Sequence, residues 1–162
     1  MTISVGDRLP EAQLIRMGRE GPEQIDITAR ISGKRVVLVG MPGAYTSTCT
    51  EAHVPSLIRN AEALKAKGID EIIIFAVNDV HIMTHWGQTT GASAAGITML
   101  ADWDASLTKG LGLNFTAPPV GFMDRCTRVG MIVNDGVVEV LQMEEKRGVC
   151  SMTSGETLLA EA

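Results

Sequence analysis

Two short runs of β-branched and aliphatic residues constrain the fold of this 162-residue chain more than any other feature. The first run lies within residues 35–40 and the second within residues 71–77. Each is almost continuously apolar, which is typical of a strand covered on both faces. Between them, residues 50–67 have the amphipathic pattern of a helix, and Gly68 follows as a C-terminal cap. This order predicts a parallel strand-helix-strand unit with a right-handed crossover.

Further elements are expected on both sides of this unit, separated by polar or glycine-rich turns. We expect strands over residues 12–16, 23–28 and 97–101, helices over 80–90, 103–111 and 154–160, a loop over 114–121, and a hairpin of 127–133 with 137–143 around the turn at 134–136. The predicted fold class is therefore α/β, with a central mixed β-sheet flanked by helices and an N-terminal extension, in a single domain over residues 1–162.

Composition argues against several classes of function. The 14 basic and 19 acidic residues give a net charge of −5, which disfavours nucleic acid as a partner and leaves no basic patch for a membrane surface. No apolar run reaches the ~18 residues of a membrane span, and the first residues lack the signal-peptide pattern, so a cytoplasmic location is expected. The three cysteines, Cys49, Cys126 and Cys150, include no Cys-x-x-Cys pair. We therefore expect no disulfide framework, no metal site and no cofactor.

Residues 41–49, Met-Pro-Gly-Ala-Tyr-Thr-Ser-Thr-Cys, join the first buried strand to the helix. Cys49 thus lies in the first turn of a helix, where unpaired N–H groups and the positive end of the helix dipole favour a thiolate, the nucleophilic form of cysteine. The hydroxyl of Thr46, three residues earlier, can reach the sulfur. Pro42 has no N–H and can shield the sulfur without competing for hydrogen bonds. This stretch predicts a reactive cysteine.

The spacing Pro-x-x-x-Thr-x-x-Cys of Pro42, Thr46 and Cys49 resembles the active-site motif of the peroxiredoxins, the thiol-dependent peroxidases. Residues 49–55 are similar to the type II, atypical two-cysteine (animal peroxiredoxin-five-like) subfamily, and the resemblance extends over nearly the whole chain. It implies a thioredoxin-like fold and the reduction of hydrogen peroxide and alkyl hydroperoxides by a Cys49 thiolate, which becomes a sulfenic acid. It also implies a homodimer, and a substrate pocket that includes Gly43 and Thr48.

Peroxide reduction also needs a cation beside the sulfur. The resemblance points to Arg128, which precedes the strand leading into the hairpin, with Arg125 as the rival nearby. A guanidinium is always charged and offers a planar fork of donors, able to stabilise a thiolate and to hold a peroxide oxygen. Cys126, between the two arginines, is interpreted as an incidental thiol. His53 is expected to pack on its helix rather than to carry protons.

The route by which the sulfenic acid is reduced stays open at this point. In animal-type members a second cysteine before the last helix forms a disulfide with the peroxidatic one. Cys150 lies in that region, although the family position falls on Met152. The alternative is a one-cysteine mechanism, in which a thiol reductant such as glutathione, glutaredoxin or thioredoxin attacks directly.

Other functions fit these residues less well. A disulfide oxidoreductase of thioredoxin type needs two neighbouring cysteines, and Thr46 stands where the second would be. His81 and His85 lie four residues apart on a predicted helix but lack a third ligand, so a solvated helix face is expected. A peroxide sensor or redox-relay binding protein would use the same Cys49 thiolate and remains the alternative function.

Overall fold

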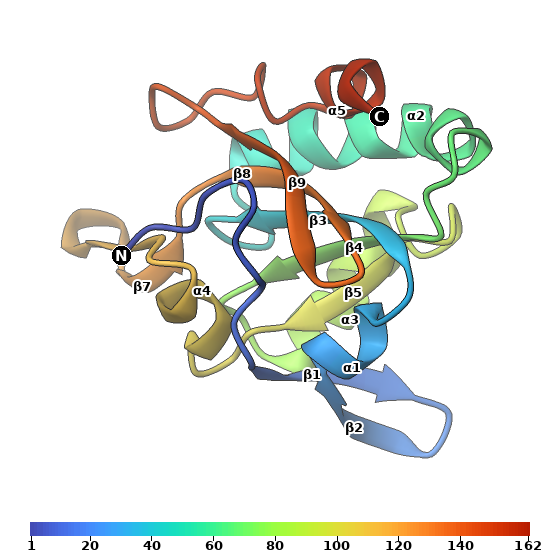
Figure 1. The fold of residues 1–162 in the computed structure, drawn as a ribbon. Helices are drawn as coiled ribbons and strands as arrows, with labels where there is room; N and C mark the ends of the chain where they lie inside the picture. Colours follow the sequence, from blue (N-terminus) through green and yellow to red (C-terminus); the bar gives the residue numbers. More distant parts are fainter.

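The computed structural model describes residues 1–162 and has one large mixed sheet at its centre (Figure 1). Its strands are β1 (Gln13–Gly18), β2 (Gly21–Asp26), β3 (Arg35–Met41), β4 (Glu71–Ala76), β5 (Thr98–Ala101), β8 (Val129–Asn134) and β9 (Val137–Met143). They lie in the order β2-β1-β5-β4-β3-β8-β9, so β3 is an interior strand. Strands β3, β4 and β5 are parallel, while β8 pairs antiparallel with the other side of β3. The predicted strand-helix-strand unit is confirmed.

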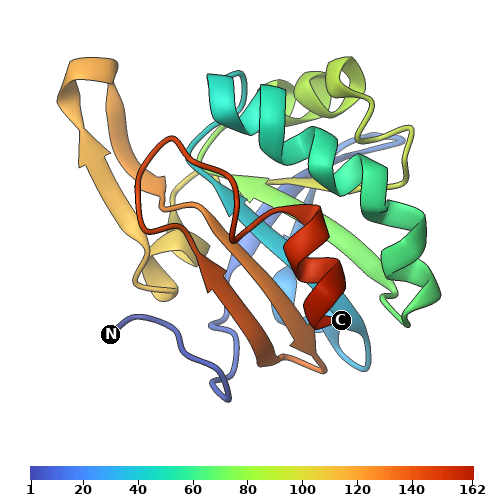
Figure 2. The same ribbon diagram turned by 90° about the horizontal axis from the view of Figure 1, so that it is seen from above.

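Helices cover both faces of the sheet (Figures 1 and 2). Three of them, α2 (Val54–Ala66), α3 (Val80–Thr90) and α5 (Gly155–Glu161), pack on one face, and α1 (Ile27–Ile31) and α4 (Ser106–Gly110) pack on the other. Alternate residues of a strand point to opposite faces. In β3, Val37 and Val39 accordingly enter the first core, whereas Val36 and Leu38 enter the second. The prediction that this strand is covered on both faces is confirmed.

The last hairpin and the chain start also follow the predictions. Strands β8 and β9 are joined by Asp135 and Gly136, whose φ angles of 47° and 81° are those of a tight two-residue hairpin turn. The N-terminal extension runs beside β9, where the Leu9 N–H donates to the Gly136 carbonyl at 2.8 Å. No helix combines the length and the apolar character that a membrane crossing requires.

The prediction of a loop over residues 114–121 is wrong. Strands β6 (Asn114–Ala117) and β7 (Phe122–Cys126) form a separate antiparallel pair, closed by a 3-10 turn at Pro118–Val120. The two prolines lie in that turn, where no N–H is needed for strand pairing. Figure 2 shows this hairpin projecting from the body of the molecule.

Two other boundaries differ from the predictions. The predicted strand 23–28 stops at Asp26, whose side chain accepts from the Ala29 N–H and so begins α1, a single turn that the sequence analysis missed. The predicted helix 103–111 begins only at Ser106. Buried Asp102 accepts from the N–H groups of Leu107 and Thr108 at 3.0 and 2.8 Å, which fixes where that helix starts.

Candidate active site

Cys49 is the first residue of a π-helical turn, Cys49–His53, that follows β3 and continues into α2. Its side chain is completely buried, and Arg128 Nη2 donates to its Sγ at 3.1 Å. The two residues are 79 positions apart but meet because β3 and β8 are neighbours, with Gly40 paired to Val129. Arg128 thus makes the hydrogen bond to the sulfur, whereas Arg125 donates to the Pro42 carbonyl, and the role of Arg128 as the cation of the site stays a prediction.

Arg128 is buried without a carboxylate partner. Arg128 is only 5% exposed, and it takes part in none of the ion pairs of the structure. A buried charge without a compensating group is strongly unfavourable. The two side chains that accept hydrogen bonds from Arg128 are His53 and Cys49.

His53 holds the other side of the Arg128 guanidinium. Arg128 Nη1 donates to His53 Nδ1 at 2.8 Å, and His53 Nε2 donates to the Thr153 carbonyl at 2.8 Å, which fixes the tautomer. Burial, together with the Arg128 charge, lowers the pKa of His53 to about 3. The ring is therefore neutral and able to accept from Arg128. These surroundings agree with the prediction that His53 packs rather than carries protons, but its contact with Arg128 was not predicted.

The loop before Cys49 is held by backbone acceptors. The Thr46 hydroxyl donates to the Gly43 carbonyl at 2.8 Å, and Arg125 Nη1 donates to the Pro42 carbonyl at 3.0 Å. A Cβ on Gly43 would collide with that Arg125 nitrogen, so glycine lets the arginine cross the loop. Gly43 is buried and does not line the pocket, whereas Pro42, Thr46 and Thr48 do.

Contacts with α3 and with Asn78, which precedes it, anchor the same loop. Tyr45 adopts a φ of 64°, and its hydroxyl contacts His85 Nδ1. The Ala44 N–H donates to Asn78 Oδ1 at 2.9 Å. His81 is exposed on the helix face, as expected for a solvated position, while His85 is engaged with the loop.

Cys150 lies in the segment between β9 and α5, which Glu144 holds in place. The Glu144 carboxylate accepts from the Ser151 N–H at 2.7 Å and hydroxyl at 3.1 Å, and from the Thr153 N–H at 2.9 Å and hydroxyl at 2.8 Å. Burial opposes ionisation of Glu144, but these hydrogen bonds outweigh it and lower its pKa. Cys150 is half-buried and not bonded to Cys49, and burial raises the pKa of its thiol. Met152, at the family position, is 45% exposed.

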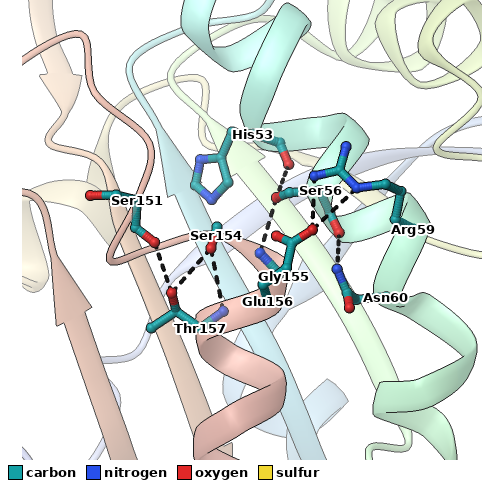
Figure 3. Close-up of polar contacts among 9 residues, drawn as sticks. All are labelled: His53, Ser56, Arg59, Asn60, Ser151, Ser154, Gly155, Glu156 and Thr157. Atoms are coloured by element: carbon teal, nitrogen blue, oxygen red, sulfur yellow. Dashed lines mark hydrogen bonds and ion pairs between the residues drawn. The ribbon is translucent and has the colours of Figure 1, made fainter.

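The segment ends where α5 meets α2, beside His53 (Figure 3). The Gly155 N–H donates to Ser56 Oγ at 3.0 Å, and the Ser56 hydroxyl donates to the His53 carbonyl at 2.6 Å. These bonds join the start of α5 to the turn that carries Cys49. The position of the Cys150 segment is thereby tied to the active-site helix.

A pocket of about 510 Å³ opens in front of this loop. The β6–β7 hairpin forms one side and the residues after β9 form the other. The sequence analysis missed most of its lining, because the hairpin was not predicted. The lining residues outside the motif are Phe115, Ala117, Val120, Phe122, Thr127, Arg128, Glu144, Glu145, Lys146, Arg147 and Gly148.

Cys126 belongs to the opposite face of the sheet. It is fully buried in the second core, and burial raises its pKa to about 12. Its thiol donates to the Thr127 carbonyl at 3.2 Å. These surroundings agree with the interpretation of Cys126 as an incidental thiol.

Comparisons with known proteins agree on one family. The Redoxin family profile matches residues 4–157. The chain is 36% identical to Peroxiredoxin-2C of Oryza sativa subsp. japonica, covering 97% of this chain and 96% of that protein. It superposes with a TM-score of 0.93 on the reduced Prx3 of Vibrio vulnificus in complex with hydrogen peroxide, at 41% identity over 99% of both chains. Peroxiredoxin 5 of Alvinella pompejana, at 24% identity, shares the fold with a TM-score of 0.85 over 98% of this chain and 96% of that one.

Proposed function

The chain belongs to the peroxiredoxin family of thiol-dependent peroxidases with a thioredoxin-like fold, and from this premise we propose that Cys49 is its peroxidatic nucleophile and that hydrogen peroxide and small alkyl hydroperoxides are its substrates. The Cys49 thiolate attacks one oxygen of the peroxide, forming an S–O bond as the O–O bond breaks. The sulfur is oxidised to a sulfenic acid, and the other oxygen takes a proton and leaves as water or an alcohol.

Arg128, Thr46 and Pro42 assist this reaction in different ways. Arg128 stabilises the thiolate and then the negative charge that develops on the leaving oxygen. The Thr46 hydroxyl already donates to Gly43, so its oxygen remains free to accept from the peroxide O–H. Pro42 forms a wall of the pocket that presents no N–H to the sulfur.

The observation that carries this proposal is the burial of Arg128 without a carboxylate. A guanidinium in that position is compensated when Cys49 is an anion. The pairing supports a thiolate held ready in a water-poor site, which is the state that peroxide reduction requires.

Stopped-flow fluorescence tests this assignment, because buried Trp86 donates to Thr50 beside Cys49 and can report oxidation. Cys49→Ser should abolish the reaction with hydrogen peroxide. Arg128→Met should slow it by about 10²-fold or more, the usual loss when a preorganised donor is removed. Arg19→Met, at an exposed turn, is the control and should react normally. An unchanged rate in Cys49→Ser would refute the proposal.

For regeneration we propose attack on the sulfenic acid by an external thiol such as glutathione, giving a mixed disulfide and water. A second thiol then releases Cys49. Two observations support this route over Cys150: the Glu144 hydrogen bonds hold the Cys150 segment, and burial keeps the Cys150 thiol protonated and hence weakly nucleophilic.

Intact mass spectrometry after one equivalent of peroxide tests the route. Without added thiol, wild type should accumulate a sulfenic acid that dimedone traps. Rapid loss of the trappable species with formation of a Cys49–Cys150 disulfide would contradict it.

We also propose a homodimer, as the family resemblance suggests. Sedimentation should give twice the 17.3 kDa chain mass.

A further inference from the structure

The pocket in front of the loop that leads to Cys49 is much larger than hydrogen peroxide requires. Pro42, Thr46 and Arg128 line it, and the buried Cys49 lies behind them. Its volume of about 510 Å³ lies in the range of pockets that bind whole organic ligands, roughly 300–1,000 Å³. A water molecule occupies about 30 Å³ in the liquid, so a peroxide with two oxygen atoms would fill only a small part. The residues that line the pocket indicate which ligand fits the remaining space.

One wall is aromatic and apolar. Phe115 of β6 and Phe122 of β7 lie edge to face, with ring centroids 6.1 Å apart. Ala117 and Val120 extend this wall to the tip of the hairpin. Val120 is 65% exposed, so the apolar surface continues to the pocket mouth. Such a wall suits a hydrocarbon chain.

The opposite side carries cations that have no carboxylate partner. Lys146 and Arg147 line the pocket, and neither takes part in an ion pair. The Arg147 guanidinium lies over the Phe115 ring, 4.4 Å from its centroid, which brings its charge to the edge of the apolar wall. Of the two glutamates in the lining, Glu144 is occupied by Ser151 and Thr153, while Glu145 faces no hydrogen-bonding partner.

We propose that this pocket binds organic hydroperoxides with an apolar chain and a carboxylate, and that Arg147 and Phe115 determine this preference. The proposal rests on the proposed peroxidase function of Cys49. The chain would lie on Phe115 and Phe122, with the carboxylate at Arg147. The Cys49 sulfur takes the terminal oxygen with its hydrogen, the O–O bond breaks, and the alkoxide takes a proton from solvent to leave as a hydroxy acid.

The aromatic wall favours such a substrate over a thiol reductant with the same charge. Glutathione is polar along its whole length and has no hydrocarbon chain to place on the side of the pocket that Phe115 and Phe122 form.

The test compares three oxidants in stopped-flow mixing with reduced protein: hydrogen peroxide, a fatty-acid hydroperoxide and the methyl ester of that hydroperoxide. Wild type should react about fivefold faster with the acid than with the ester, as expected for one partly exposed ion pair. The difference should shrink in high salt. Arg147→Ala should remove the preference and Arg147→Glu should reverse it, with each rate expressed relative to that of the same protein with hydrogen peroxide.

Phe115→Ala should slow both organic oxidants relative to hydrogen peroxide, and Arg19→Ala is the control with a lost charge far from the pocket. Equal rates with acid and ester, or a preference unchanged in Arg147→Ala, would overturn the proposal. So would an Arg147→Ala defect confined to reduction by glutathione, which would assign the charge to the reductant. Failure of wild type to react with hydrogen peroxide would instead refute the peroxidase function itself.

Discussion

His53 determines how the Arg128 guanidinium can point. Because its neutral ring accepts one N–H of the guanidinium, the other terminal nitrogen is directed at the Cys49 sulfur. A protonated ring would have no lone pair and would repel Arg128. The low pKa of His53, about 3, therefore preserves this arrangement over the whole range in which a peroxidase works.

The same pKa makes stability depend on pH. In the unfolded chain His53 titrates near 6.5, but in the folded chain it stays neutral to about pH 3, so only the unfolded state gains its proton between these values. Stability should therefore fall as the pH drops below 6.5, by about 2 kcal/mol between pH 7 and pH 5 from this residue. Urea unfolding at the two pH values measures the loss.

The matched variant is His53→Gln, which keeps a side-chain acceptor and donor without an ionisable ring. Its unfolding free energy should lose about 2 kcal/mol less than that of wild type over the same interval. His81 and His85 remain in both proteins, so they cancel in the comparison. Equal pH dependence in the two proteins would show that His53 is charged when folded.

Among the active-site residues, the sequence itself indicated those that lie within one short stretch. Pro42, Thr46 and Cys49 are close along the chain, so one stretch shows both the position of the cysteine at a helix start and the spacing that resembles the family motif. Arg128 entered only through the family resemblance. The contact of His53 with the Thr153 carbonyl joins residues 100 positions apart and follows from the packing of α5 on α2, which no local pattern encodes.

At the scale of elements, Gly155 sets the approach of α5 to α2. A Cβ there would lie 2.7 Å from the Ser56 carbonyl carbon, and the backbone cannot move aside cheaply. Gly155→Ala should therefore destabilise the protein by about 1–3 kcal/mol, the typical effect of overpacking. It should also slow oxidation of Cys49, because displaced α5 shifts the acceptor of His53.

Glu156→Ala is the control in the same helix. It breaks an exposed ion pair between Arg59 and the first turn of α5, which should change the unfolding free energy by less than about 1 kcal/mol. Equal effects of the two substitutions in urea unfolding would contradict the role assigned to the glycine.

Glu144 should govern whether Cys150 can reach Cys49. Glu144→Gln replaces a charged acceptor of four hydrogen bonds, and hydrogen bonds to charged groups contribute about 1.5–3 kcal/mol each. Release of the segment should raise the rate of Cys49–Cys150 disulfide formation after peroxide by about tenfold or more. Non-reducing mass spectrometry follows the product. Glu145→Gln, at the neighbouring glutamate, should behave as wild type.

The elements that the sequence predicted are those with a strong local signal. Strands β3 and β4 are almost continuous apolar runs. Asp135 and Gly136 are residue types that favour the positive φ angles of a tight hairpin turn. The β6–β7 hairpin was missed because its two prolines suggested a loop, and because neither strand contributes a long apolar run. Since this hairpin builds one wall of the pocket, the pocket could not be predicted either.

At the scale of the whole molecule, the sheet separates the cysteines. Cys49 lies in the core under α2, α3 and α5, and Cys126 lies in the core on the other face. Both side chains are fully buried and belong to different cores. We therefore expect oxidation at Cys49 to leave the Cys126 thiol intact.

Because Arg128 has no carboxylate partner, the redox state of Cys49 should change the melting temperature of the protein. Conversion of Cys49 to a neutral sulfenic acid leaves the guanidinium without a compensating anion. In Cys150→Ser protein, which cannot form the Cys49–Cys150 disulfide, we expect the oxidised form to melt about 2–4 °C below the reduced form for each 1 kcal/mol lost. Differential scanning calorimetry measures the gap, and equal melting temperatures would contradict it. Each peroxide consumed thus lowers the stability of the folded chain around Arg128 and Cys49, where the reducing thiol attacks. Reduction of the sulfenic acid restores that stability.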